Sequence, residues 1–138
     1  MHLTGRCHCG ALSASLETGL DADAIEVRAD GCSFCTARGV KTVSDPHGKL
    51  ILRFDGTGAH AYRFGFKTAD FWLCNGCGAF AAATTEIDGR LFGVLNVAGM
   101  CVDPLAGRTA KIVDFSSEDP ASRDARRAAR WTPTQILR

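Results

Sequence analysis

The sequence predicts a mainly β domain held together by a metal ion, and three observations lead to this prediction. Apolar and polar residues alternate with a period of two in many short stretches, fifteen glycines separate those stretches, and most of the seven cysteines occur in closely spaced pairs. With 138 residues, 46% of them hydrophobic, the chain can bury a core without disulfide bonds. We expect one domain over residues 1–138, with a β core over about 1–115 and a helical extension over about 117–138.

Five short strands are expected in the first half of the chain. Two of the stretches, residues 11–17 and 24–29, alternate apolar and polar positions as on a half-buried strand, and Gly, Asp or Pro residues mark turns between the stretches. The stretches are residues 2–6, 11–17, 24–29, 40–43 and 50–54. Residues 30–39 interrupt the alternation, and we expect a loop with one turn of helix there.

Four further strands are expected in the second half, on the same alternation. They are residues 59–64, 69–73, 79–86 and 90–97. The last two flank Asp88-Gly89, a dipeptide typical of a two-residue hairpin turn, so we expect them to pair with each other.

The C-terminal segment carries a helix signal instead. Asp119 suits the N-cap and Pro120 the first helical position, so residues 121–130 are expected to be helical. An alanine recurs every fourth residue from Ala121 to Ala129, and these alanines would share one face of the helix. We expect that face to pack on the sheet.

The charge and hydropathy patterns indicate neither nucleic-acid nor membrane binding. The formal net charge is +1, and residues 117–138 carry an excess of only two positive charges, whereas nucleic-acid-binding domains carry a strongly basic face. No stretch approaches the roughly 20 apolar residues of a membrane span, and the N-terminus lacks a secretory apolar region. We therefore expect a cytoplasmic protein, and the sequence leaves its oligomeric state open.

Four of the cysteines have the spacing of zinc ligands. Cys74 and Cys77 lie on a glycine-containing Cys-x-x-Cys turn, as in a zinc knuckle, and Cys7 and Cys9 would point to the same face of an extended strand. Glycines follow both pairs, and cytoplasmic cysteines seldom form disulfides. Together the four thiolates would complete a closed structural zinc site, whose binding free energy would contribute to folding.

Cys32 and Cys35 form a second Cys-x-x-Cys pair outside that set. The pair could be a redox couple, part of another four-thiolate site, or half of an open metal site. An open catalytic zinc needs three protein ligands, and Asp30 stands two positions before Cys32 as the third candidate. A redox couple would favour βαβ surroundings, which this β-rich chain lacks. Cys101 lies outside any pair, and we expect it to be a small buried residue.

Five segments in order make the chain similar to the glutathione-dependent formaldehyde-activating enzyme family, which includes the centromere-protein-V-like proteins. The segments are Gly5-Arg6-Cys7-His8-Cys9-Gly10, Cys32-Ser33-Phe34-Cys35, Tyr62-Arg63-Phe64-Gly65, Lys67-Thr68-Ala69 and Phe71-Trp72-Leu73-Cys74-Asn75-Gly76-Cys77-Gly78. The resemblance runs from about residue 3 to residue 115, with weaker similarity at Arg130-Trp131.

The resemblance implies a β-tent fold stapled by a structural zinc on the four ligand cysteines. It also implies a second, more labile zinc at a Cys-x-Cys-x-x-Cys motif, and a carbon–sulfur lyase activity. That activity joins formaldehyde and glutathione to S-(hydroxymethyl)glutathione, or reverses the reaction. This chain has Asp30 where the motif has its first cysteine. Aspartate is a legitimate zinc ligand, but a harder one than cysteine.

Two functions therefore remain as alternatives. The first is a zinc-dependent carbon–sulfur lyase with Asp30, Cys32 and Cys35 as catalytic residues, acting on a small thiol or a thiol–aldehyde adduct, for which glutathione is a candidate. The second is a non-catalytic zinc module with a degenerate second site, which binds a protein or a small thiol. Three basic residues are candidates for holding a substrate carboxylate: Arg38, Arg63 and Lys67.

Overall fold

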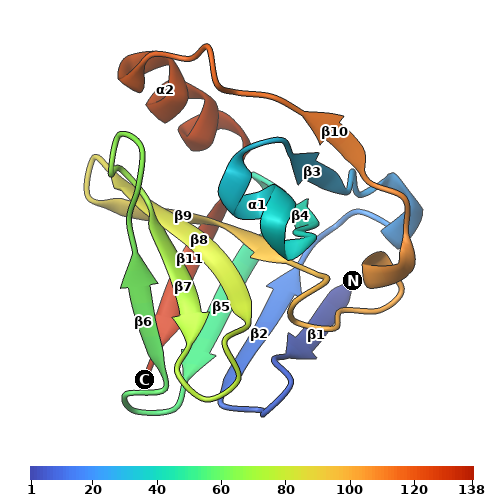
Figure 1. The fold of residues 1–138 in the computed structure, drawn as a ribbon. Helices are drawn as coiled ribbons and strands as arrows, with labels where there is room; N and C mark the ends of the chain where they lie inside the picture. Colours follow the sequence, from blue (N-terminus) through green and yellow to red (C-terminus); the bar gives the residue numbers. More distant parts are fainter.

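The computed structural model describes residues 1–138 and confirms the mainly β architecture, with 40% of residues in strands and 17% in helices (Figure 1). The strands are β1 (His2–Arg6), β2 (Leu12–Glu17), β3 (Arg28–Asp30), β4 (Thr42–Val43), β5 (Lys49–Phe54), β6 (Ala59–Tyr62), β7 (Asp70–Cys74), β8 (Phe80–Ile87), β9 (Arg90–Asn96), β10 (Lys111–Val113) and β11 (Thr132–Leu137). The helices are α1 (Ser33–Arg38) and α2 (Pro120–Arg130), with 3₁₀ turns η1 (Ala22–Ala24) and η2 (Leu105–Gly107). None of them has the length and apolar character needed to cross a bilayer.

Two groups of strands make up one large mixed sheet. β1, β2 and β5 are antiparallel neighbours, and β6 to β9 form an antiparallel meander. β11 joins the groups, because its first two residues pair with β9 and its last four pair in parallel with β5. Past β11, β9 continues alongside β4, which is followed by β3 and β10. Figure 1 shows α1 lying beside this short β3–β4 corner.

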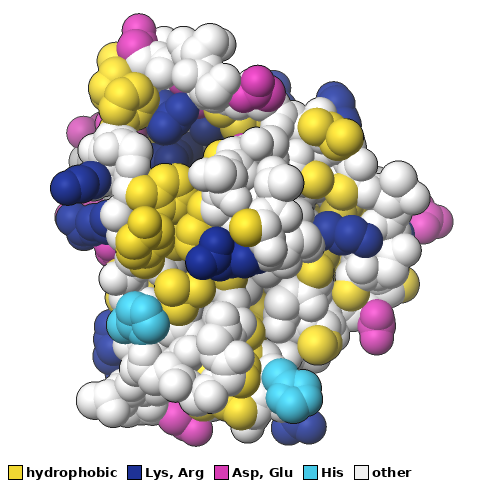
Figure 2. Space-filling view, in the orientation of Figure 1, with side chains coloured by type: hydrophobic (Ala, Val, Ile, Leu, Met, Phe, Trp, Pro, Cys, Tyr) yellow, Lys and Arg dark blue, Asp and Glu magenta, His cyan; other side chains and the backbone are white.

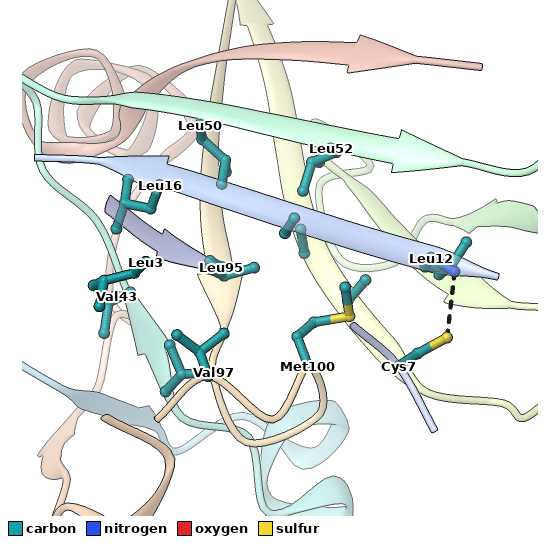
Figure 3. Packing of buried hydrophobic residues seen from close by; sticks show 14 of the residues in the cluster. Leu3, Cys7, Leu12, Leu16, Val43, Leu50, Leu52, Leu95, Val97 and Met100 are labelled. Atoms are coloured by element: carbon teal, nitrogen blue, oxygen red, sulfur yellow. Dashed lines mark hydrogen bonds between the residues drawn. The ribbon is translucent and has the colours of Figure 1, made fainter. Parts of the chain in front are cut away.

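The buried residues form two clusters, and the cysteines divide between them. The larger cluster contains 20 residues and covers the inner face of β1, β2 and β5, where Leu12, Leu16, Leu50 and Leu52 pack together (Figure 3). Cys7 and Cys74 belong to it. The smaller cluster contains nine residues, among them Phe34 of α1, Trp131 and Cys35. The two cysteine motifs are thus anchored in different parts of the core.

β3 is shorter than the strand expected over residues 24–29. Strand pairing begins only at Arg28, and η1 occupies Ala22–Ala24. Ile25 and Val27 are 1% and 3% exposed, and they alternate with exposed residues in an irregular segment. The alternation therefore predicted correctly which of these residues are buried, but the prediction that they form a strand was wrong.

The C-terminal segment is more than the helical extension expected over about 117–138. α2 is found where the helix was expected, but Thr132–Leu137 form β11, in the interior of the sheet order. Pro133 obscured this strand in the sequence, because proline cannot donate a ladder hydrogen bond and is disfavoured in inner strands. β10 was also not expected.

α2 presents the opposite face from the one expected. Its alanines, Ala121, Ala125 and Ala129 among them, are exposed, whereas Arg127 is buried. The Arg126 guanidinium lies 3.6 Å from the centre of the Phe115 ring. Arginine side chains can cover apolar groups with their stems and stack on aromatic rings, so a polar helix face can pack inward.

Candidate metal centre

Two turns at the same end of the sheet present the four expected metal ligands (Figure 1). The ligands are Cys7 and Cys9 from the β1–β2 turn and Cys74 and Cys77 from the β7–β8 turn. Both turns close alike: the Cys7 N–H donates to the Leu12 carbonyl at 3.0 Å, and the Cys74 N–H donates to the Ala79 carbonyl at 2.9 Å. Cys7 and Cys9 therefore converge through a turn and not, as expected, through alternation along a strand.

The four sulfur atoms have the spacing of a tetrahedral metal site. All lie within 4.8 Å of one another. The Sγ atom of Cys7 is 3.8 Å from those of Cys9 and Cys74, and the Cys9 and Cys74 Sγ atoms are 3.4 Å apart. A tetrahedron with metal–sulfur bonds of about 2.3 Å has edges of about 3.8 Å. The cluster could therefore hold one metal ion with all four positions filled by protein.

The glycines around these cysteines are needed for close approach and for turn geometry. A Cβ atom added to Gly76 would lie 3.0 Å from the Cys9 Sγ atom, tighter than normal contacts allow. Gly10 and Gly78 follow the second cysteine of each pair and have φ angles of 86° and 79°. Only glycine adopts this left-handed region without strain, so these residues let both turns close around the sulfur atoms.

Backbone amides of both turns donate hydrogen bonds to sulfur atoms of the cluster. The Leu12 N–H donates to the Cys7 Sγ atom at 3.3 Å (Figure 3), and the Gly76 N–H donates to the Cys74 Sγ atom at 3.3 Å. The turns thus prepare the sulfur atoms to act as metal ligands.

The pKa values of exposed Cys9 and half-buried Cys77 shift in opposite directions, because the four thiols share one small volume. Backbone hydrogen bonds from Cys9 and Ala79 lower the pKa of Cys77 to about 6. At Cys9 a backbone hydrogen bond from Ala11 acts in the same direction, but the neighbouring thiols, Cys74 first, outweigh it and the pKa rises to about 11. Four thiolates this close together need a cation to offset their charge, and a metal ion would displace the remaining protons.

The loop with the second cysteine pair is built differently. Cys32 is the N-cap of α1, and its Sγ atom accepts the Cys35 N–H at 3.4 Å. The Asp30 Oδ1 atom accepts the Cys32 N–H at 2.9 Å. The ligand atoms of Asp30, Cys32 and Cys35 do not form a second compact cluster like that of the four cysteines. Burial, followed by the nearby charges of Cys32 and Asp30, raises the pKa of the Cys35 thiol.

A hollow of about 310 Å³ adjoins this loop, lined by Asp30 and Cys35 together with residues of β3, α1 and the segment around β10. Its walls are largely apolar, and they include Val40 and Ile112. Ile112 is 81% exposed, on a strand that the sequence did not indicate. The sequence therefore offered no sign of this hollow, although it identified two of its lining residues.

The remaining candidates are placed as follows. Cys101 is exposed at a left-handed φ of 53°, so the expectation that it is buried was wrong. Arg63 is 2.5 Å from the Asp70 carboxylate, and Arg38 donates to the Phe34 carbonyl at 3.1 Å. Lys67 is exposed and forms no salt bridge. Of the three basic candidates for carboxylate binding, only Lys67 is without a side-chain partner.

Comparison with known proteins supports the fold. The chain is similar to a solved structure of a Rhodobacter sphaeroides protein, a Northeast Structural Genomics target, with 27% sequence identity and a TM-score of 0.57. The similarity covers 80% of this chain and 99% of that chain. No protein-family model and no curated protein matches the sequence.

Proposed function

We propose that the protein is a zinc-dependent carbon–sulfur lyase acting on a thiol–aldehyde adduct of the S-(hydroxymethyl)glutathione type. The observation that carries the proposal is the place of the second cysteine pair. The four-sulfur cluster uses neither Cys32 nor Cys35, and Cys35 lines an apolar hollow together with Asp30. The resemblance of the sequence to the formaldehyde-activating family supports the same reaction class.

In this proposal the four-sulfur cluster holds a structural zinc and takes no part in the chemistry. Its four positions are filled by Cys7, Cys9, Cys74 and Cys77, which leaves none for a substrate. Its contribution is to tie the β1–β2 turn to the β7–β8 turn across 65 or more residues of sequence. Since metal binding of this kind is coupled to folding, the cluster stabilises the sheet that carries α1.

The residues at the hollow supply what the reaction needs. The carbon–sulfur bond forms when a thiolate sulfur attacks the aldehyde carbon and the carbonyl oxygen takes up the proton that the thiol has lost; the reverse step breaks the same bond. The thiols of Cys32 and Cys35 and the carboxylate of Asp30 are donors that zinc accepts. Zinc bound there would act as a Lewis acid towards the sulfur or the carbonyl oxygen. Val40, which is 3% exposed, gives the hollow an apolar wall next to these donors.

One contact favours the second candidate function, a zinc module without catalytic activity. The Asp30 carboxylate already accepts a hydrogen bond from the Cys32 N–H, which gives the residue a purely structural reason to be there. The three donor atoms are also not gathered into one compact group. Binding a metal through all three would require the Asp30 side chain or one of the thiols to rotate.

Metal content and turnover together test the proposal. Purified protein should bind two zinc ions per chain, and it should accelerate the exchange between formaldehyde, glutathione and their adduct, followed by exchange NMR because the uncatalysed reaction also equilibrates. Cys35→Ala should lose the second zinc and the acceleration while its circular dichroism is unchanged. Cys101→Ala is the matched control and should keep both. A single tightly bound zinc, with no second ion taken up at micromolar excess, contradicts the lyase and favours the module.

A further inference from the structure

The inner side of α2 is a row of arginines, which reverses the usual pattern of a packed helix. The row, here called the arginine face, consists of Arg123, Arg126, Arg127 and Arg130, and helical spacing puts all four within one stripe. The first three are buried or half-buried, and Arg130, at the end of the helix, is exposed. Figure 2 shows basic side chains set back beneath α2 at the top of the molecule, above a patch of hydrophobic side chains.

Only one carboxylate makes salt bridges to this face. Glu118 lies 3.2 Å from Arg123 Nε and 2.7 Å from Arg126 Nε, so a single acidic residue serves two guanidinium groups. Neither of the other two arginines forms a salt bridge. The arginine face therefore carries an uncompensated positive charge.

Arg127 shows the cost of this arrangement. It is 7% exposed, it donates from Nη1 to the Thr68 hydroxyl at 2.9 Å, and its buried Nε atom has no partner. Burial, followed by the charges of Arg126 and Arg123, lowers its pKa to about 10. A buried cation with an unmet hydrogen bond destabilises a fold unless something else offsets its charge.

A further arginine without a carboxylate partner, Arg28, lies on a different element, β3. Arg28 of β3 donates to the Ser44 hydroxyl at 2.6 Å and contacts no carboxylate.

Arg28, Ser44 and Arg130 line one recess of about 310 Å³. Glu26 forms part of its wall, and that carboxylate lies 3.8 Å from the Lys111 ammonium group. The recess thus presents two guanidinium groups and a hydroxyl.

The helix dipole explains only some of these arginine positions. Cations near a helix C-terminus are favourable, which explains basic residues such as Arg127 and Arg130 in the last turn of α2. It does not explain why Arg28, on β3, is half-buried in the wall of the recess that Arg130 also lines. Like charges that lie close together destabilise a fold. Where a fold keeps them, we expect a group of opposite charge to bind.

We propose that this recess is a binding site for a small oxyanion, a phosphate or a carboxylate group held between the guanidinium groups of Arg28 and Arg130, with the Ser44 hydroxyl as a further donor. Guanidinium groups suit this role because their planar donors match the oxygens of both groups. The recess shares no lining residue with the hollow beside Cys35, and the proposal does not depend on the proposed lyase activity.

Calorimetric titration of the zinc-loaded protein tests the proposal, with inorganic phosphate and malonate as separate probes at matched ionic strength. At least one should bind saturably, one per chain, and which one binds identifies the group recognised. Arg130→Gln, at an exposed position, should weaken that binding about tenfold or more, the loss of one charge-assisted hydrogen bond. Arg28→Gln, checked for folding by circular dichroism, should do the same.

Arg53→Gln is the matched control, because it removes one exposed arginine charge from a residue without a salt bridge and far along the sheet order from β3. It should leave the affinity within about twofold of the wild-type value. Saturable binding of neither probe overturns the proposal, as does an Arg53→Gln loss equal to that of Arg130→Gln, which would mean that only the overall charge matters.

Discussion

The four-sulfur cluster and the Asp30–Cys35 loop each contain a Cys-x-x-Cys pair, but they differ in what surrounds the sulfur atoms. The four-sulfur cluster is closed by two matching hairpin turns with backbone amides directed at Cys7 and Cys74, both 2% exposed. In the Asp30–Cys35 loop, Cys32 instead caps a short helix, and Asp30 and Cys35 line a hollow. Four protein ligands suit a structural metal, whereas an open ligand position is what a substrate requires. The difference teaches that Cys-x-x-Cys spacing alone does not assign a role.

The largest effect on stability is expected from removing one ligand of the four-sulfur cluster. Cys74→Ser removes a buried ligand, and because metal binding is coupled to folding, the free energy of unfolding should fall by about 4 kcal/mol or more. Chemical denaturation and zinc analysis measure this, with exposed Cys101→Ser as the control that should change neither. Unchanged stability and zinc content in Cys74→Ser would show that the cluster holds no structural metal.

Cys35→Ala should have a large effect on turnover and a small one on folding. The thiol is 6% exposed in the smaller core cluster, so its loss should cost about 1–2 kcal/mol of stability. Adduct exchange should fall to the uncatalysed rate. Retention of full turnover would place the chemistry elsewhere.

A smaller loss of stability is expected when a methyl group is added next to the four-sulfur cluster and all four ligands are kept. Gly76→Ala places a methyl group 3.0 Å from the Cys9 Sγ atom, which should cost about 1–3 kcal/mol of stability and weaken zinc binding. Gly107→Ala is the control, since a methyl group there meets nothing within 4 Å. Competition with a chelator reports the affinity; equal zinc affinity in both variants would mean that the turn relaxes without disturbing the ligands.

The smallest effect concerns Asp30. Asp30→Asn keeps an oxygen to accept the Cys32 N–H, so its stability should stay within about 0.5 kcal/mol of the wild type, whereas Asp30→Ala should lose about 1 kcal/mol. Under the lyase proposal, Asp30→Asn should nevertheless lower zinc occupancy at Cys32 and Cys35, because a carboxylate ligand is removed. Unchanged occupancy would restrict Asp30 to capping the loop.

Much of the fold could be predicted because its signals are local. Alternation located most of the strands, Asp119-Pro120 located the start of α2, and Asp88-Gly89 located the β8–β9 turn. The four metal ligands could also be predicted from local signals. Two closely spaced cysteine pairs, each followed by glycine, are visible in the sequence before it is known how the pairs meet. These features depend on backbone geometry over a few residues, which the sequence specifies directly.

Tertiary structure decided what depends on distant partners. Only the complete sheet gives β11 two neighbours in spite of Pro133, and only the fold brings Arg127 of α2 to the hydroxyl of Thr68, 59 positions earlier in the sequence. The hollow beside Cys35 likewise needs β10, which pairs with β3 from more than 80 residues away. The residues alone therefore determined a mainly β chain with four cysteines suited to one metal site. Which helix face is buried and which cysteines border open space were settled by long-range packing, because a local pattern can show that a segment has two faces but not which face its partners will cover.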